Sequence, residues 1–294
     1  MSTLRELKGR IGSVASTGKI TSAMKMISSA KMHKAEQGLK KLLPYRSLVQ
    51  SVISHLLATD GEFTSPLIEE RDVRRVGVVV LGSDDGLCGA YNINIFKHLL
   101  GIIAAYKQQY GENVDIEIYP VGKKIARASQ KIAGGRLSVK VVEGINTRST
   151  TEQISLFTEQ LKQGFESGVL DKVDLVYMHF KSMSKQILTC DQLLPVSYTA
   201  LVDGAAKADN SACLFEPSPN AIFNSVLPLH IKSTMQEVFV ENVASENAAR
   251  VMAMQSASDN ANKLLESLRL EYNKLRQQGI TTELLDILGG QVEK

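Results

Sequence analysis

The turn Gly82-Ser-Asp-Asp-Gly-Leu-Cys-Gly89 is the part of this sequence whose residue types come closest to a chemical site. It follows a run typical of a buried strand, 75–81, and precedes a predicted helix from about Asn92 to Tyr110, and doubly wound α/β folds bind phosphates at such a junction. The glycines do not match the GxGxxG pattern, and two carboxylates, Asp84 and Asp85, would repel a phosphate. We interpret the turn as structural or as a subunit-contact loop, and expect no cofactor.

The remaining reactive side chains do not form a catalytic or metal-binding pattern. The five histidines share no spacing typical of a metal site or a catalytic triad. Cys88, Cys190 and Cys213 are widely separated and match no CxxC motif, so we expect neither a disulfide framework nor a zinc site, and a reducing compartment. The sequence therefore predicts a protein that is not an enzyme and holds no metal.

The middle of the chain reads as an α/β domain over residues 72–213. Predicted strands alternate with predicted helices, and the last two strands have a connection of only Lys181–Lys185 between them. This order predicts a Rossmann-like parallel sheet with an antiparallel edge. The expected strands are 75–81, 114–121, 137–142, 173–180 and 186–196, and the expected helices are 92–110, 122–133 and 149–167.

A long helix is predicted for residues 218–294, beginning at Ser218-Pro219 with a break near Pro228. Its apolar and small residues recur in steps of three and four, which is the 3.5-residue period of a coiled-coil seam. The seam positions are Val251, Met254, Ser258, Ala261, Leu265, Leu268, Tyr272 and Leu275. A helix of this kind needs a partner.

The partner is predicted at the other end of the chain, in residues 1–59. Leu4, Leu7, Ile11 and Val14 have the same spacing, and the pattern resumes at Leu39 and continues through Pro44, where we expect a kink. Between Gly18 and Ala35 the sequence indicates a slip in phase, with Ile20, Met24, Ile27 and Met32 replacing the seam. The fold class predicted is thus an α/β domain inserted between two helices that form a long antiparallel coiled coil.

The C-terminal helix is predicted to be longer than its partner by about 15 residues, or about 20 Å. This excess contains Ile280, Leu284, Leu285, Ile287 and Leu288. Exposed apolar residues of this density usually mark a contact with another protein. Folding back onto the chain itself is the alternative.

Charge and hydropathy exclude some classes of protein. The net charge of +3 is too small to identify a partner, but residues 1–41 hold nine Lys or Arg and only two acidic residues. The lysines around Met24 indicate either a solvated face or a contact with an acidic protein surface. Nucleic-acid binding by this helix is disfavoured because its apolar seam runs through the same residues. No apolar run approaches the roughly 20 residues of a membrane span, and the N-terminal residues resemble neither a signal nor a transit peptide.

Several motifs resemble those of the gamma subunit of F-type ATP synthases. Thr17-Gly-Lys-Ile-Thr-Ser-Ala-Met-Lys-Met26, followed by Lys31, is similar to the opening motif of that family. The turn at 83–89 is similar to its central motif, although the family usually has Arg where Asp85 stands. Ser245–Met254, Tyr272–Gln277 and Ile280–Leu284 are similar to its C-terminal signature. The order of the motifs is that of the family across nearly the whole chain.

The resemblance implies a non-catalytic central rotor shaft of the ATP synthase. Its helices would stand inside the hexamer of alpha and beta subunits, and its α/β domain would form a foot against the epsilon subunit and the c-ring. It would transmit torque and take part in regulating ATPase activity and proton flow. The cysteine pair of the redox-regulated chloroplast form is missing, so thiol control is not expected. The absence of a visible transit peptide favours a bacterial protein, which the resemblance implies to be peripheral on the cytoplasmic face of the inner membrane.

The resemblance also implies roles for individual residues. Met24 and Lys25 correspond to the position facing an acidic lever of beta, and Glu246 and Arg250 to polar coupling positions. Arg276 and Gln277 correspond to a pair that bonds a beta loop, with Thr281 and Glu283 on the same tip. The resemblance implies that Ile280, Leu284, Leu285 and Leu288 face an apolar sleeve, inside which they would turn, and that Leu214, Phe215 and Glu216 approach the c-ring. A nucleotide-sensing α/β module on a coiled-coil signalling stalk is the alternative function.

Overall fold

The structure is a computed structural model that describes residues 3–58, 63–197, 201 and 215–291, without the side chains of 286 and 288–291. The chain separates into two compact units, one formed by Met1–Ser29 with Arg250–Lys294 and the other by Ala30–Ala249. Helices α1 (Leu4–Leu57) and α6 (Pro219–Gln291) each contribute to both units. Each unit is described separately below.

The larger unit contains a five-stranded sheet in the order β3-β2-β1-β4-β5. Its strands are β1 (Arg75–Leu81), β2 (Asp115–Val121), β3 (Leu137–Val139), β4 (Lys172–Ser182) and β5 (Lys185–Leu194). The first four strands pair in parallel, and β5 pairs antiparallel to β4. The predicted mixed sheet is therefore confirmed. β3 ends at Val139 rather than Val142, and only Met183 and Ser184 separate β4 from β5.

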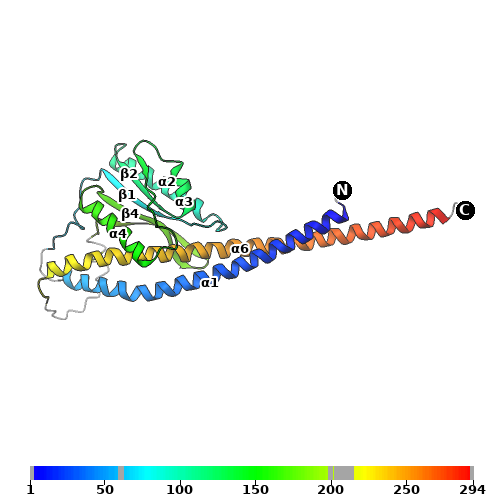
Figure 1. Cartoon of the computed structure of the whole chain (residues 1–294), viewed down its shortest axis with the longest axis horizontal. Helices are drawn as coiled ribbons and strands as arrows, with labels where there is room; N and C mark the ends of the chain where they lie inside the picture. Colours follow the sequence, from blue (N-terminus) through cyan, green and yellow to red (C-terminus); the bar gives the residue numbers. More distant parts are fainter. Residues whose placement is uncertain (1–2, 59–62, 198–200, 202–214, 292–294) are drawn as a thin grey trace. The chain divides into compact units, whose positions relative to one another are not determined.

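Helices cover both faces of this sheet (Figure 1). On one face lie α2 (Tyr91–Tyr110) and α3 (Lys123–Gln130), which bury Ile95, Leu99 and Ile125 against the strands. On the other face lie α4 (Thr151–Glu166) and the first part of α6, with α1 packed next to them. The second core is the larger one because it combines α4, α6, α1 and the sheet.

The N-terminal end of α6 begins as the sequence indicates. Ser218 Oγ accepts a hydrogen bond from Ala221 N at 3.3 Å, and Pro219 occupies the first helical position, where its missing N–H costs nothing. The predicted break at Pro228 is wrong, because α6 continues through it as one helix. Phe223, Leu227 and Ile231 follow one another at steps of four and are fully buried, so packing holds the helix on both sides of the proline.

In the smaller unit, the ends of α1 and α6 pair antiparallel along the predicted seam. Val251, Met254 and Leu268 are buried on α6, and Leu7 is buried on α1. A Cβ placed on Gly18 would lie 3.6 Å from the Cβ of Ala261, so this glycine allows the helices to approach closely. A Cβ placed on Gly9 or Gly12 would have no neighbouring atom within 4 Å in the described part of the chain, so close helix contact does not require glycine at these two positions.

The predicted slip in phase of the α1 seam is wrong. Thr21 and Ser28 are buried, whereas Ile20 and Ile27 are exposed, so the seam keeps its spacing of three and four through Gly18, Thr21, Lys25 and Ser28. Of the four residues predicted to replace the seam, Met32 is buried, and its position continues this unbroken spacing. The seam here is made of small and polar residues. Hydropathy alone does not identify such positions, because a short side chain at a helix contact is selected for size rather than for apolar area.

Candidate partner-contact surfaces

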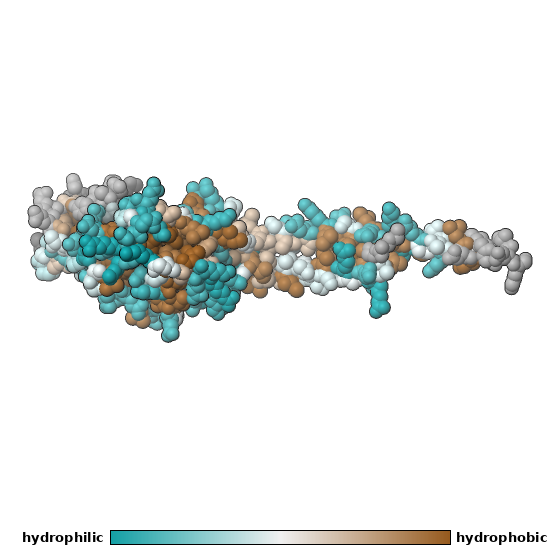
Figure 2. Space-filling model, turned by 90° about the horizontal axis from the view of Figure 1, so that it is seen from above, coloured by the Kyte–Doolittle hydropathy of each residue, from teal (hydrophilic) through white to brown (hydrophobic). Residues whose placement is uncertain are grey.

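The C-terminal end of α6 extends past the end of α1 (Figure 1). Because Gly18 lies opposite Ala261 and the helices are antiparallel, Thr3 comes opposite about residue 276. About 15 residues of α6, roughly 22 Å of helix, therefore lie beyond its partner. Figure 2 shows apolar surface on α6 close to this end.

The apolar side chains of this end are open to solvent in the isolated chain. Ile280, Leu284, Leu285 and Ile287 are 48, 56, 63 and 63% exposed. Ile280, Leu284 and Ile287 lie on one stripe of the helix, since their spacing is four and three residues. The side chain of Leu288 lies outside the described residues. We call Ile280, Leu284, Leu285 and Ile287 the apolar tip.

Polar residues on the same segment are also exposed. The side chains of Arg276, Gln277 and Glu283 are turned to solvent, and Thr281 Oγ1 donates a hydrogen bond to the carbonyl of Gln277 at 2.9 Å. A guanidinium and an amide next to an apolar stripe are suited to bonding a loop of another protein while the apolar residues are buried. The predicted contact residues of this segment that the structure describes therefore all lie on the exposed end of α6.

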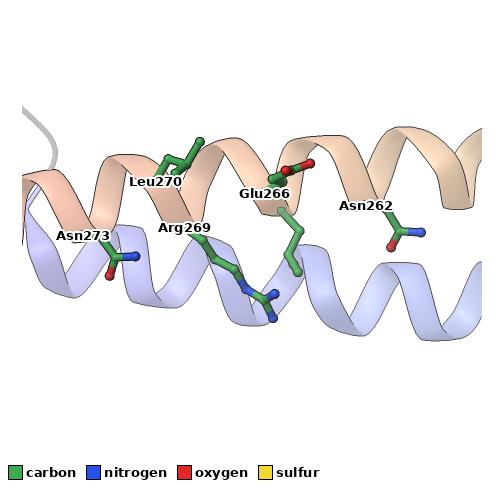
Figure 3. A pocket seen from close by; sticks show the side chains of 6 residues that line it. Asn262, Glu266, Arg269, Leu270 and Asn273 are labelled. Atoms are coloured by element: carbon green, nitrogen blue, oxygen red, sulfur yellow. The ribbon is translucent and has the colours of Figure 1, made fainter.

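A groove lies on α6 just before this segment (Figure 3). It is lined by Asn262, Leu265, Glu266, Arg269, Leu270 and Asn273, of which Arg269 points toward α1 and Leu270 away from it. All of its lining residues come from one helix and the groove is open to solvent, so it does not enclose a small ligand.

Met24 and Lys25 are half-buried on α1 in the smaller unit. Lys25 occupies a seam position, where a long side chain can cover apolar surface with its methylene groups and keep its ammonium in solvent. Ile20 and Ile27 lie one turn before and after Met24 and are exposed, which places Met24 within an apolar stripe on the outer side of α1.

Glu246 and Arg250 are buried within the chain, and each has an interaction partner. Their predicted role in coupling stays a prediction. At the other end of α6, Phe215 packs partly against the larger core and Glu216 is exposed, while Leu214 lies outside the described residues.

The turn between β1 and α2 is closed by its own side chains. Asp84 accepts hydrogen bonds from the backbone N of Lys123 at 3.0 Å and from Thr147 N and Oγ1 at 3.1 and 2.6 Å. Asn92 bonds both Ser83 N and Ser83 Oγ. The Asp84 carboxylate therefore joins this turn to the N-terminus of α3, and its negative charge would repel a phosphate bound in the turn. The geometry supports the structural interpretation of this turn.

A partly buried polar layer between α6, α1 and the sheet was missed by the sequence analysis. Arg46 forms an ion pair with Glu237, and His179 Nδ1 lies 2.9 Å from Glu241 Oε2. Burial raises the pKa of the Glu241 carboxyl, and burial with the nearby Arg46 lowers the pKa of His230 to about 4. Two features of the sequence could have indicated this layer: Arg46 at an otherwise apolar seam position of the N-terminal helix, and Glu237 and Glu241 four residues apart on the C-terminal helix.

Another polar cluster lies beside β4. Tyr106 donates a hydrogen bond to Asp174, and Lys172 Nζ lies 3.1 Å from Asp174 Oδ2. Desolvation of the Cys190 thiol by surrounding protein, together with the Asp174 carboxylate, raises its pKa to about 11, so this cysteine is a poor nucleophile although part of the residue is exposed. Among the described residues, no group of three or more His, Cys, Asp or Glu is arranged to hold a metal ion. The described helices include none long and apolar enough to cross a membrane.

Solved structures with this fold are chains of rotary ATP synthases. A chain from the Euglena gracilis mitochondrial ATP synthase, solved with OSCP, F1 and the c-ring, matches with a TM-score of 0.62 and 20% identity, covering 98% of this chain and 93% of that one. A chain of the Tetrahymena thermophila mitochondrial ATP synthase central stalk and c-ring matches with a TM-score of 0.53 and 22% identity, covering 81% and 99%. At these identities the likeness establishes the fold alone.

Sequence similarity establishes the family. The model of the ATP synthase family matches residues 3–292, and the chain belongs to this family. Its relatives are gamma chains: the ATP synthase gamma chain of Phocaeicola vulgatus is 41% identical over 292 residues, covering 99% of this chain and all of that one. The gamma chain of Parabacteroides distasonis is 40% identical over 290 residues, covering 99% and 98%. The resemblance to gamma subunits is therefore confirmed.

Proposed function

We propose that this chain is the central rotor shaft of a bacterial ATP synthase, which transmits torque between the c-ring and the catalytic alpha/beta hexamer. The chain is a non-catalytic subunit, and it takes part in regulating ATPase activity and proton flow. The observation that carries the proposal is the end of α6, which extends past α1 with its apolar tip exposed. In an isolated protein these exposed apolar side chains contribute no burial energy, whereas a shaft inserted in an apolar sleeve would bury them.

The parts of the chain fit this role. We propose residues 1–59 and 218–294 as the shaft and 72–213 as the foot that contacts the epsilon subunit and the c-ring. Paired helices resist bending and twisting more than one helix does, and apolar contacts have no preferred direction, so an apolar tip can turn inside an apolar sleeve. Rotation of an asymmetric shaft presents different faces to each beta subunit and thereby changes nucleotide affinity at sites outside this chain.

Partner contacts are proposed for individual residues. Arg276, Gln277, Thr281 and Glu283 would bond beta or alpha loops, with Ile280, Leu284, Leu285 and Leu288 against the sleeve. Met24 and Lys25 would contact an acidic segment of beta. Glu246 and Arg250, which are buried here, would act by fixing α6. Leu214, Phe215 and Glu216 would lie near the c-ring at the cytoplasmic face of the inner membrane.

Reconstitution tests the proposal. The full chain, tagged on the foot side at Ser184→Cys, is mixed with purified alpha and beta subunits of the same organism and recovered through the tag. Recovery of one chain per three alpha and three beta, with ATPase activity that depends on the chain, is the expected result. Recovery of the chain alone at micromolar concentrations of all subunits would overturn the proposal.

A further inference from the structure

Hydrogen bonds from one turn of α6 join this helix to the α/β domain. Asn242 Oδ1 accepts a hydrogen bond from Tyr91 Oη at 2.6 Å, and Asn242 Nδ2 donates one to the carbonyl of Gly82 at 2.9 Å. Ser245 Oγ donates one to the carbonyl of Met178 at 2.8 Å. Tyr91 begins α2, Gly82 follows β1 and Met178 lies in β4, so three parts of the domain are bonded to α6. We call Tyr91, Asn242 and Ser245 the α6 anchor.

The α6 anchor is closed to water. Tyr91, Asn242 and Ser245 are 3, 1 and 0% exposed. Because water cannot replace a hydrogen bond that is broken at this depth, a displacement of α6 that breaks one of them leaves a buried polar group without a partner, which is strongly unfavourable. The hydrogen bonds therefore oppose both a turn of α6 about its own axis and a slide along it.

The acceptors on the domain side are held in place by the sheet. Gly82 N donates a hydrogen bond to the carbonyl of Val121 at 2.9 Å, which ties the end of β1 to β2. A Cβ placed on Gly82 would lie 2.7 Å from the Cβ of Ile125, so this backbone is packed directly against α3. Met178 lies in the part of β4 that pairs with β5, opposite Leu188. The α6 anchor thus ends on backbone that resists following a movement of α6.

The preceding part of α6 packs against the domain in a different way. Its buried side chains are apolar and spaced four residues apart: Phe223, Leu227, Ile231 and Met235. Apolar contacts have no preferred direction, so they hold α6 on the domain but resist a small turn less than hydrogen bonds do. Polar pairs add little net stability, since each group loses its hydration on burial, but they require one geometry. The α6 anchor therefore restricts the angle of α6 more than the apolar contacts before it.

We propose that the α6 anchor fixes the angle of α6 relative to the α/β domain, and that torque passes between this domain and the shaft helix through its hydrogen bonds. Tyr91, Asn242 and Ser245 are then positioning residues for torque transmission. The hydrogen bonds end on three separate parts of the domain, so α6 cannot turn without breaking at least one of them. From this segment α6 continues to Gln291 as one helix. The inference rests on the proposed function.

Replacement of the α6 anchor by apolar groups of similar shape tests the inference. The anchor variant is Tyr91→Phe/Asn242→Leu/Ser245→Ala. Its matched control is Ser54→Ala/Tyr119→Phe/Thr158→Val, which also removes three side-chain hydrogen bonds of the larger unit. Each control bond is closed within a single helix or strand, so none of them joins α6 to the domain.

The assay measures how firmly the domain is held at one angle. Wild type and both variants carry Cys190→Ser and a probe on Ser184→Cys in the β4–β5 turn, and each is assembled with a surface-immobilised alpha/beta hexamer at limiting Mg-ATP. The variance of the probe angle within a pause is compared with the melting temperature of the chain. The anchor variant should show about twofold greater variance than wild type, because mainly undirected apolar contacts then oppose a turn of α6. The control should keep the wild-type variance.

A second variant keeps the test decisive if the anchor variant does not assemble. Tyr91→Phe/Ser245→Ala removes two hydroxyl groups and keeps Asn242, and it should also increase the variance, to a smaller extent. A lower melting temperature without increased variance would show a role in stability alone and would overturn the inference, while leaving the rotor proposal intact. A wild-type chain whose probe stays fixed while the complex hydrolyses ATP would overturn the rotor proposal together with this inference.

Discussion

Removing the apolar tip should weaken insertion into the hexamer much more than turnover. The variant is Ile280→Ser/Leu284→Ser/Leu285→Ser. These side chains are 48, 56 and 63% exposed, so roughly half of each remains to be buried by a partner. Full burial of a Leu or Ile is worth about 1.5–3 kcal/mol, so each should contribute about 1 kcal/mol and the three together about 3 kcal/mol. This corresponds to about a 150-fold increase in Kd.

The assay measures the affinity of the labelled chain for the purified alpha/beta hexamer, together with ATP hydrolysis per assembled complex. Leu48→Ser/Leu100→Ser/Leu156→Ser is the control, since these leucines are also exposed and helical but lie in the larger unit. Ile280→Ala/Leu284→Ala/Leu285→Ala separates lost contact area from fraying of the helix, because alanine favours helix. An unchanged Kd for both tip variants would refute the reasoning, and so would equal weakening by the control.

Further predictions concern the fold and its polar layer. Arg46→Met should lower the free energy of unfolding, measured by urea titration, by about 2 kcal/mol, because Glu237 remains buried without its cation. The double variant Arg46→Met/Glu237→Leu should recover most of this loss. Equal losses in the two variants would contradict a pairing role for Arg46. The pKa of His230 is about 4 in the folded chain, below its value of about 6.5 in the unfolded chain. Between pH 4 and pH 6.5 the folded chain therefore binds fewer protons than the unfolded chain, and the free energy of unfolding should fall by up to about 3 kcal/mol as pH drops from 6.5 to 4. His230→Gln should flatten this decline in melting temperature, and an identical pH profile would contradict the assignment. Gly12→Ala should stabilise the chain by about 1 kcal/mol, since nothing lies within 4 Å of the new methyl in the described chain, whereas Gly122→Ala should destabilise it, because φ is +108° and the methyl would lie 2.9 Å from Ser83 backbone atoms. Calorimetric titration with Mg-ATP should give no binding heat at millimolar nucleotide, because the Asp84 and Asp85 carboxylates in the β1–α2 turn would repel the phosphates; saturable heat would favour the nucleotide-sensing alternative.

Much of the fold could be predicted from the sequence because its signals are local and periodic. Val251, Met254 and Leu268 mark the α6 seam by spacing alone, and their burial follows. The run 76–81 has no polar side chain, as a strand buried on both faces requires, and together with the exposed Arg75 it forms β1 with the predicted ends.

The errors arise where tertiary contacts outweigh local preference. Between Gly18 and Ala35 hydropathy does not identify the buried face of α1, since Thr21 and Ser28 are buried with Met32 whereas Ile20 and Ile27 are exposed. Pro228 lies inside α6, and the residues before and after it are buried in the larger core, which keeps the helix continuous through the proline. Neither the buried face of α1 in this range nor the continuity of α6 through Pro228 can be predicted from neighbouring residues in the sequence.

The polar contacts were beyond prediction for a related reason. Arg46 and Glu237 are far apart in the sequence, as are His179 and Glu241, and their pairing depends on the register of α1, α6 and β4. The tip residues needed no tertiary information, because they lie on one uninterrupted helix.

Observation of single molecules tests the rotor most directly. The chain, with Cys190→Ser and a probe on Ser184→Cys in the β4–β5 turn, is assembled with a surface-immobilised alpha/beta hexamer and supplied with Mg-ATP. The rotor proposal predicts that the probe turns in one direction, in repeated steps, and stops when ATP is withdrawn. A probe that remains fixed while the same complexes hydrolyse ATP would contradict it.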